Sequence, residues 1–447
     1  MATPRKWAGR PAIAAWCMYD WANSAFTTLV VTFVYATYFT KAFAPDQNAG
    51  TELWSRGIVI SSVIITLLSP ILGTMADRGG RRRRSLIIST AVSVAATTAL
   101  AFVAPGGSGA VIAALTFFII ANVAFEIGMV FYNAFLPALV PPERIGRVSG
   151  YGWGLGYVGG LAALVVALLG FVGLGGMKPW LALDTTAGFN IRATNLLVAA
   201  WFLVFSIPAF LTLREAPATE GGGGGGGGVA QAFIELGRTF RQIRRYREIV
   251  KFLVARLIYN DGLVTVFAFG AVYASGTFGM GFSEVMIFGI VLNVAAGAGA
   301  LLFGFIDDRV GGRITVLASL VALSCATVIT VLAPDRTWFW VGGVLIGLFV
   351  GPNQSASRSL MGRFVPERHQ AEFFGFFAFS GKATSFMGPL LLGLLTGSFG
   401  QRAGVASVIL FFVIGGAILL TVDEGRGIAA ARAMGTATEA AAGTDHP

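Results

Sequence analysis

The chain has 447 residues, of which 55% are hydrophobic and only 12% are charged, and its formal net charge is +10. Charged residues make up roughly a quarter of a typical soluble domain, so this composition excludes an ordinary soluble protein and favours a membrane protein. Two cysteines and two histidines are too few for a disulfide framework or a zinc site.

Long apolar runs predict helices that cross a membrane, because about 20 helical residues span the roughly 30 Å of hydrocarbon. The runs are continuous rather than alternating, which favours helices over a closed sheet. We expect an all-α polytopic membrane protein with twelve transmembrane helices. Their expected spans are 13–40, 56–76, 85–104, 110–135, 149–172, 194–213, 249–275, 283–306, 314–333, 338–360, 372–397 and 404–422.

The basic residues predict the orientation of these helices. Most of the 32 Lys and Arg residues lie on one side of the predicted map, which includes both termini. Since cytoplasmic loops carry the excess of positive charge, we expect both termini in the cytoplasm. The net charge then reflects topology, and we expect the lipid bilayer as a partner and no nucleic acid.

The middle of the chain carries eight consecutive glycines, residues 221–228, which predict a flexible tether. Apolar residues then recur at helical spacing opposite arginines over 229–247, which predicts a basic amphipathic helix on the lipid surface or the bundle. We therefore expect a first six-helix bundle over 1–213, a linker over 214–248 and a second bundle over 249–425. The tail, 426–447, is expected to be disordered.

A short basic loop occurs twice, after the second and the eighth expected span. Its two copies contain Gly73, Asp77, Arg78, Gly80, Arg81, Arg82 and Arg83, and Gly304, Asp308, Arg309, Gly311 and Arg313. A second repeated motif, Pro-Glu-Arg, precedes the fifth span at 142–144 and the eleventh at 366–368. Both motifs keep the same direction, which indicates two parallel six-helix repeats.

These loops suggest a gate between the two repeats. An acid at the end of one helix, close to the positive N-terminus of another and beside arginines, can hold the two helices together in one state and release them in another. The alternative is that the arginines only set the topology. The predicted gating residues are Asp77, Arg78, Arg82, Asp308, Arg309, Arg313 and, near the end of the tenth span, Arg358.

Ionisable residues inside the spans are candidates for a substrate or proton site, because they are costly in a membrane. Asp20 in the first span and Asp261 in the seventh occupy comparable places in the two repeats. Tyr19 adjoins Asp20, and Tyr259 and Asn260 precede Asp261, so both acids have polar and aromatic neighbours. Helix-to-helix structural bonding is the alternative role.

Four further polar residues complete this candidate site: Asn23, Glu126, Asn133 and Lys382. A zwitterion such as an amino acid needs an acceptor for its ammonium and a donor for its carboxylate, and acids together with Lys382 could supply both. Arg256, one turn before Asn260, is a further cation inside an expected span. The same residues could instead form a closed salt-bridge network that binds no ligand.

The first basic loop, Gly73-x-x-x-Asp77-Arg78-x-Gly80-Arg81-Arg82-Arg83, resembles the hallmark loop of major facilitator superfamily transporters. Its second copy departs once, with Gly312 where a basic residue is common. Shorter segments over residues 13–422 resemble the vacuole-effluxer-like branch of that superfamily. These segments are 19–26, 132–137, 146–150, 259–262, 372–375 and 380–385.

The resemblance implies the major facilitator fold and secondary transport of a small polar solute, by alternating access. Fungal members of the branch export amino acids from the vacuole, and bacterial members mostly lack assigned substrates, so amino acids are the first expectation. A proton-coupled exporter of another metabolite or drug is the alternative, and a non-transporting sensor or scaffold is the alternative from another class. The resemblance also favours the inner membrane of a bacterium.

Neither a phosphate-binding loop nor a nucleophile paired with a base occurs, so we expect no enzyme and no cofactor, although a proton gradient can supply energy. Two fused repeats form a central path without a partner, so we expect a monomer to be functional.

Overall fold

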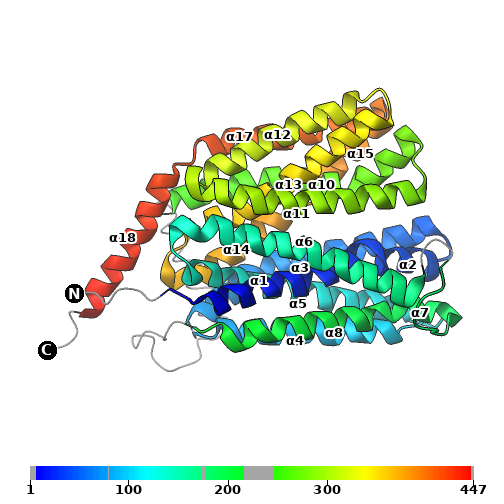
Figure 1. Ribbon diagram of the computed structural model, residues 1–447, viewed down its shortest axis with the longest axis horizontal. Coiled ribbons are helices and arrows are strands. Elements are labelled where there is room, and N and C mark those ends of the chain that lie inside the picture. Colours follow the sequence, from blue (N-terminus) through cyan, green and yellow to red (C-terminus); the bar gives the residue numbers. More distant parts are fainter. Residues whose placement is uncertain (1–6, 79, 174–176, 216–245, 444–447) are drawn as a thin grey trace.

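The computed structural model describes residues 7–78, 80–173, 177–215 and 246–443, and these residues fold into a bundle of helices (Figure 1). The first half contains α1 Arg10–Ala25, α2 Tyr35–Ala42, α3 Gln47–Arg78, α4 Arg82–Phe102, α5 Ala110–Leu139, α6 Ile145–Ala167, α7 Phe189–Arg192 and α8 Thr194–Thr212. The second half contains α10 Arg247–Phe278, α11 Phe282–Val310, α12 Gly312–Leu332, α13 Arg336–Phe364, α14 Gln370–Lys382, α15 Met387–Phe399, α16 Gln401–Ala406 and α17 Val408–Leu420, followed by α18 Glu424–Gly443.

Nine helical segments of the described chain are long and apolar enough to cross a membrane. They are Gln47–Asp77, Arg82–Phe102, Ala110–Leu139, Pro142–Val172, Thr186–Thr212, Arg247–Phe278, Glu284–Val310, Gly312–Leu332 and Gln401–Leu420. The other three expected spans correspond to α1 with α2, to α13, and to α14 with α15.

The first and eleventh expected spans are both interrupted, where sequence periodicity alone indicates continuous helices. A π-helical segment, Phe26–Phe33, separates α1 from α2. Turns at 383–386 separate α14 from α15. Pro389 near the start of α15 cannot donate a backbone hydrogen bond to the preceding turn, which favours a break there.

The two halves contact each other most extensively through α6 with α11 and α3 with α14, and also through α6 with α13 and α5 with α14 (Figure 1). Small residues permit this close packing. A side chain at Gly150 would meet the backbone of α11, including Gly304, and one at Gly73 would meet the backbone carbonyl of Ala371. Glycine is needed at these positions because the backbones themselves approach each other.

The outer faces of the helices carry large exposed apolar side chains. Leu67 on α3 is 64% exposed, Leu302 on α11 is 61% exposed and Leu394 on α15 is 62% exposed. Such faces suit contact with lipid. The interior is filled instead by buried aromatic residues such as Trp16 and Phe118, each 0% exposed.

The C-terminal tail is helical, so the expectation of disorder over 426–447 is wrong for the part of the tail that the structure describes. Helix α18 covers Glu424–Gly443 and extends away from the bundle (Figure 1). Several alanines between 429 and 442 explain the helix, because alanine has the highest intrinsic helix propensity. The glycine tether and nearly all of the basic segment over 229–247 lie outside the described residues.

Candidate functional site

The candidate site lies between the two halves. Asp20 on α1 and Glu126 on α5 come from the first half, whereas Asp261 on α10, Arg358 on α13 and Lys382 at the end of α14 come from the second. The structure joins these residues in two ion pairs that cross between the halves, and it leaves Asp261 apart from both.

The first ion pair joins Arg358 to Asp20, with 2.9 Å between Nη1 and Oδ2. Both side chains are buried, at 2% and 7% exposure. The Arg358 guanidinium also donates to the Ser149 hydroxyl at 2.9 Å, to the Ser149 carbonyl at 2.7 Å and to the Asn133 amide oxygen at 3.5 Å. Every one of these acceptors belongs to the first half, so Arg358 links the halves.

A rigid aromatic frame surrounds this ion pair. The Trp16 ring stacks on Tyr132 at 4.6 Å, and Tyr132 stacks on Tyr19 at 4.8 Å. The Trp16 indole donates to the Tyr132 carbonyl at 3.0 Å, while the Tyr19 hydroxyl bonds to Thr90 at 2.8 Å. Asn23 donates to the second oxygen of Asp20 at 3.3 Å. All of these contacts lie within the first half, and Asn23 is the one that touches the acid.

The second ion pair joins Lys382 to Glu126 at 2.7 Å, and it is more accessible than the first. The two side chains are 30% and 21% exposed, respectively. Arg256 lies beside this pair, where it donates to the Phe377 carbonyl at 2.6 Å and to the Ser380 hydroxyl at 2.8 Å. Its guanidinium lies 3.6 Å from the centre of the Phe377 ring.

Arg256 has no acidic partner within ion-pair distance among the described residues. The cluster of Glu126, Lys382 and Arg256 therefore has two cations and one acid. Asn260 also contacts this region, because its amide donates to the Gly381 carbonyl at 3.0 Å. An anionic group of a ligand could bind between the two cations.

Asp261 is buried at the break between α14 and α15. One of its oxygens accepts the Gly388 backbone N–H at 3.0 Å, and Oδ1 has no hydrogen-bond partner in the described chain. Asp261 is 1% exposed. Tyr259, two residues earlier, is bonded to the Ser357 hydroxyl at 2.8 Å. A buried carboxylate oxygen without a donor is costly when charged, which makes Asp261 unlike Asp20.

The predicted gate residue Asp77, next to the last residue of α3, joins the two halves. Its two oxygens accept the backbone N–H groups of Ala371 and Glu372, at 3.0 and 2.8 Å, in the first turn of α14. Arg82 donates to Asp77 at 2.7 Å and to the side chain of Gln370. A carboxylate here is stabilised by the N-terminus of α14.

The repeated loop makes the reciprocal contact. Asp308 accepts the backbone N–H of Gly146 at 2.8 Å, at the start of α6, and its other oxygen pairs with Arg147 at 2.5 Å. Arg363 on α13 lies 3.6 Å from Asp308 and 2.6 Å from Asp307. Glu424, at the start of α18, lies 3.5 Å from Arg363 and accepts the backbone N–H groups of Gly312 and Arg313.

The other predicted gate residues contact other parts of the molecule. Arg313 donates to the carbonyls of Leu419 and Leu420, at 3.3 and 2.7 Å, and so joins α12 to α17 within one half. Arg309 is exposed. The side chain of Arg78 lies outside the described part of the chain.

Sequence reasoning missed four residues of this network, which are Arg147, Asp307, Arg363 and Glu424. Adjacent acids at the end of the eighth span and a second arginine five residues after Arg358 were the available signals. Neither signal identifies partners, because the distances depend on how α11 and α13 cross.

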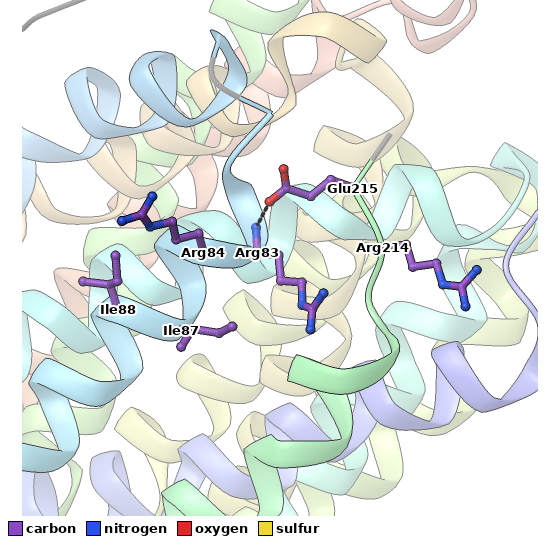
Figure 2. A pocket seen from close by; sticks show the side chains of 6 residues that line it. All are labelled: Arg83, Arg84, Ile87, Ile88, Arg214 and Glu215. Atoms are coloured by element: carbon purple, nitrogen blue, oxygen red, sulfur yellow. Dashed lines mark hydrogen bonds between the residues drawn. The ribbon is translucent and has the colours of Figure 1, made fainter. Parts of the chain in front are cut away.

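A shallow pocket of about 460 Å³ lies away from the interface between the halves, and Figure 2 shows its lining. Its residues are Arg83, Arg84, Ile87, Ile88, Arg214 and Glu215. Glu215 accepts the backbone N–H of Arg83 at the start of α4. Burial raises the pKa of the Glu215 carboxyl, and the backbone donors of Arg83 and Arg84 oppose that shift. The chain continues from Glu215 into undescribed residues, so this pocket supports no ligand site.

The fold is that of the major facilitator superfamily. The structure is similar to the proton:xylose symporter XylE, with a TM-score of 0.73, 12% identity and coverage of 95% of this chain and 98% of that one. It is also similar to the transporter FucP in its outward conformation, with a TM-score of 0.69, 14% identity and coverage of 93% and 100%. At these identities the likeness shows the fold alone.

The model of the vacuole effluxer Atg22-like family matches residues 53–432. The MFS-type transporter YxiO of Bacillus subtilis, described as uncharacterized, is 31% identical over 92% of this chain and 94% of its own length. Autophagy-related protein 22 of Coccidioides immitis is 24% identical over 86% of this chain and 74% of its own. The chain therefore belongs to the vacuole effluxer Atg22-like family. It is an integral membrane protein and a secondary transporter, not an enzyme.

Proposed function

We propose that the protein transports amino acids or closely related small zwitterions by alternating access. The observation that carries this proposal is the cluster of Glu126, Lys382 and Arg256 between the halves. It combines an ion pair that crosses the interface with one further cation that has no acidic partner among the described residues.

The chemistry of the cluster fits a zwitterion. A substrate carboxylate can bind between Arg256 and Lys382, and a substrate ammonium can bind Glu126, so one solute can contact all three charged groups. Charge-assisted hydrogen bonds of this kind are strong where water is scarce. The partial exposure of Lys382 and Glu126 supports access for a solute, in contrast to the buried pair of Asp20 and Arg358.

The position of the cluster connects binding to movement. Because Lys382 and Glu126 belong to different halves, a solute that inserts between them replaces a direct link by a bridged one. The halves can then rock about the site, as parallel repeats do in this kind of transporter. We place the closed end, with Asp77 and Asp308, in the cytoplasm of a bacterial cell, in agreement with the excess of basic residues there.

Asp261 is our candidate for proton coupling. Its Oδ1 atom is buried without a donor in the described chain, and its other oxygen holds the start of α15. Protonation would remove the cost of a buried charge and weaken the attraction to the N-terminus of α15.

Counterflow in proteoliposomes tests the substrate class. A labelled amino-acid mixture should exchange through the wild-type protein, and Glu126→Gln and Arg256→Gln should each lower the rate at least tenfold. Glu52→Gln is the matched control, because Glu52 forms an exposed pair with Arg56 at 2.5 Å on the same half as Glu126. Folded protein that exchanges no amino acid would overturn the substrate class and favour another metabolite, a drug or the sensor function.

A second measurement tests the role of Asp261. Asp261→Asn should abolish the dependence of net uptake on an inward proton gradient and should retain at least half of the exchange rate, since exchange needs no net proton movement. Equal loss of exchange and net uptake would assign Asp261 to substrate binding or folding instead.

A further inference from the structure

We propose that the first half contains a preformed binding site for a small organic cation, a guanidinium or primary ammonium group, and that Arg358 occupies this site as an internal ligand in the closed state. The proposal rests on the alternating access proposed above, because that movement is what withdraws Arg358. Its components are Asp20, Asn133, Ser149 and the rings of Trp16, Tyr132 and Trp153.

The site has the composition of a cation receptor. It supplies one carboxylate, one amide oxygen, one hydroxyl and one backbone carbonyl to the guanidinium. The rings of Trp16, Trp153 and Tyr132 lie 4.7, 5.5 and 5.8 Å from the guanidinium carbon. Aromatic faces around a carboxylate are a common arrangement for binding organic cations.

All of these groups belong to the first half, whereas Arg358 belongs to the second. The receptor is also held in shape by contacts that do not involve Arg358. Trp16 is hydrogen-bonded to the Tyr132 carbonyl and stacked on its ring, and Asn23 donates to Asp20. When the halves separate at this end, the site therefore keeps its geometry and loses its cation.

Gly152 supports a fitted site rather than a loose contact. A methyl group at this position would lie 2.7 Å from Nη2 of Arg358 and would also collide with the Asp20 carboxylate. Gly152, which has no side chain, therefore lies where the guanidinium of Arg358 and the carboxylate of Asp20 meet.

An emptied site leaves Asp20 without its ion-pair partner. A cation that enters the opened site competes with Arg358 for the same acceptors. Release of that cation and return of Arg358 would accompany closure, so the second half acts as a tethered competitor of the external ligand. This site is distinct from the cluster of Glu126, Lys382 and Arg256, in which Lys382 and Arg256 are the proposed carboxylate-binding groups.

Chemical rescue tests the proposal on purified full-length protein. Arg358→Ala should lower the thermal midpoint of unfolding by several degrees, and 10 mM methylguanidinium chloride should restore at least half of that loss. The same salt should leave the wild type within one degree of its own midpoint. The control is Asp20→Asn/Arg358→Ala, which keeps the cavity and removes the acid, and which should show no rescue; sodium chloride at 10 mM controls for ionic strength.

Three outcomes would overturn the proposal. The first is no shift with methylguanidinium or ethylammonium in folded Arg358→Ala protein, and the second is an equal shift in the double variant. The third is rescue by acidification to pH 5 alone, which would make Asp20 a proton site. If Arg358→Ala does not accumulate, cells are grown with methylguanidinium. If monodisperse protein is recovered for the single variant and not for the double variant, the result supports the site. If neither variant is recovered, the result overturns it. Amino-acid counterflow can fail or succeed independently of all these results.

Discussion

The two copies of the basic loop make the same kind of contact with unequal support. Asp77 binds the N-terminus of α14 and has one arginine partner, Arg82. Asp308 binds the N-terminus of α6, and the second arginine near it, Arg363, also holds Asp307 and Glu424. When the halves are aligned on their Pro-Glu-Arg motifs, Leu139 stands where Arg363 stands in the second half. The gate is therefore symmetric in its helix contacts and asymmetric in its charges.

The largest effect is expected from Arg363→Ala. This change leaves Asp307, Asp308 and Glu424 close together without the arginine, and removal of one partner of a buried pair costs about 3–5 kcal/mol. Arg82→Ala should cost about 1–3 kcal/mol, because Asp77 keeps its two backbone donors. Thermal unfolding in detergent measures both. Equal losses for the two variants would contradict the asymmetry.

A steric comparison comes next. Gly73→Ala places a methyl group against the backbone carbonyl of Ala371, which cannot move away, and we expect a cost of about 1–3 kcal/mol to the closed state. The methyl group of Gly146→Ala would lie 2.6 Å from an oxygen of Asp307 and 2.7 Å from an oxygen of Asp308, and these two side chains can rotate away. Opening can be measured with a cysteine introduced at the buried position Ser357, through its reaction with a membrane-impermeant thiol reagent. This reactivity should rise more in the Gly73→Ala variant than in the Gly146→Ala variant. A greater rise in Gly146→Ala would show that the side-chain network is the less adaptable element.

Neutralising Asp77 or Asp308, the acids that cap α14 and α6, should have a smaller effect on the equilibrium between the closed and open states. A charge at a helix N-terminus is worth about 0.3–2 kcal/mol, so Asp77→Asn should raise the open population by up to about 30-fold. Asp308→Asn should raise it less, because Arg363 retains Asp307. Spin labels at the exposed positions Arg84 and Arg309, in a Cys325→Ser background, report the separation of the halves. A larger opening with Asp308→Asn would reverse the proposed order of the two loops.

The smallest effect is expected from the two glutamates that follow the last helix of each half. Glu424→Gln should cost about 1 kcal/mol, because the carboxylate caps α12 and contacts Arg363. Glu215→Gln should cost about half of that, since Glu215 caps α4 but forms no side-chain ion pair among the described residues like that of Glu424 with Arg363. Urea-induced unfolding followed by tryptophan fluorescence can resolve the difference, and identical midpoints would argue against it.

Periodicity predicts helix number well and helix continuity poorly. The long apolar runs predict the spans, but the turns between Lys382 and Met387 combine a local signal, Pro389, with a distant contact, since Asp261 accepts the Gly388 N–H from more than 100 residues away. The π-helical segment over Phe26–Phe33 is likewise invisible in the apolar pattern. Both interruptions occur where polar side chains of another helix or wider backbone turns replace the regular hydrogen bonds.

The sequence predicts which residues belong to the candidate site, but it does not predict which of them form ion pairs with each other. Ionisable groups are energetically costly inside a membrane span, so each one needs a partner or a functional role. This rule identifies Asp20, Glu126, Asp261 and Lys382 from the sequence. Nothing local indicates that Arg358, expected at the gate, reaches Asp20, or that Lys382 reaches Glu126. Such pairs join residues hundreds of positions apart, and only the packing of the halves brings them within hydrogen-bond distance.

Taken by itself, the amino-acid sequence determined that the chain lies in a membrane, that it consists of two parallel repeats and that its loops carry a helix-capping acid in each. These properties follow from local composition and spacing, which act over a few turns of helix. The tertiary structure alone decided which charges neutralise each other, that Arg256 and one oxygen of Asp261 are left without a charged or donating partner in the described chain, and that the second half inserts Arg358 into the first. The physical reason is that electrostatic pairing falls off within a few ångströms, so it depends on how helices distant in the chain cross.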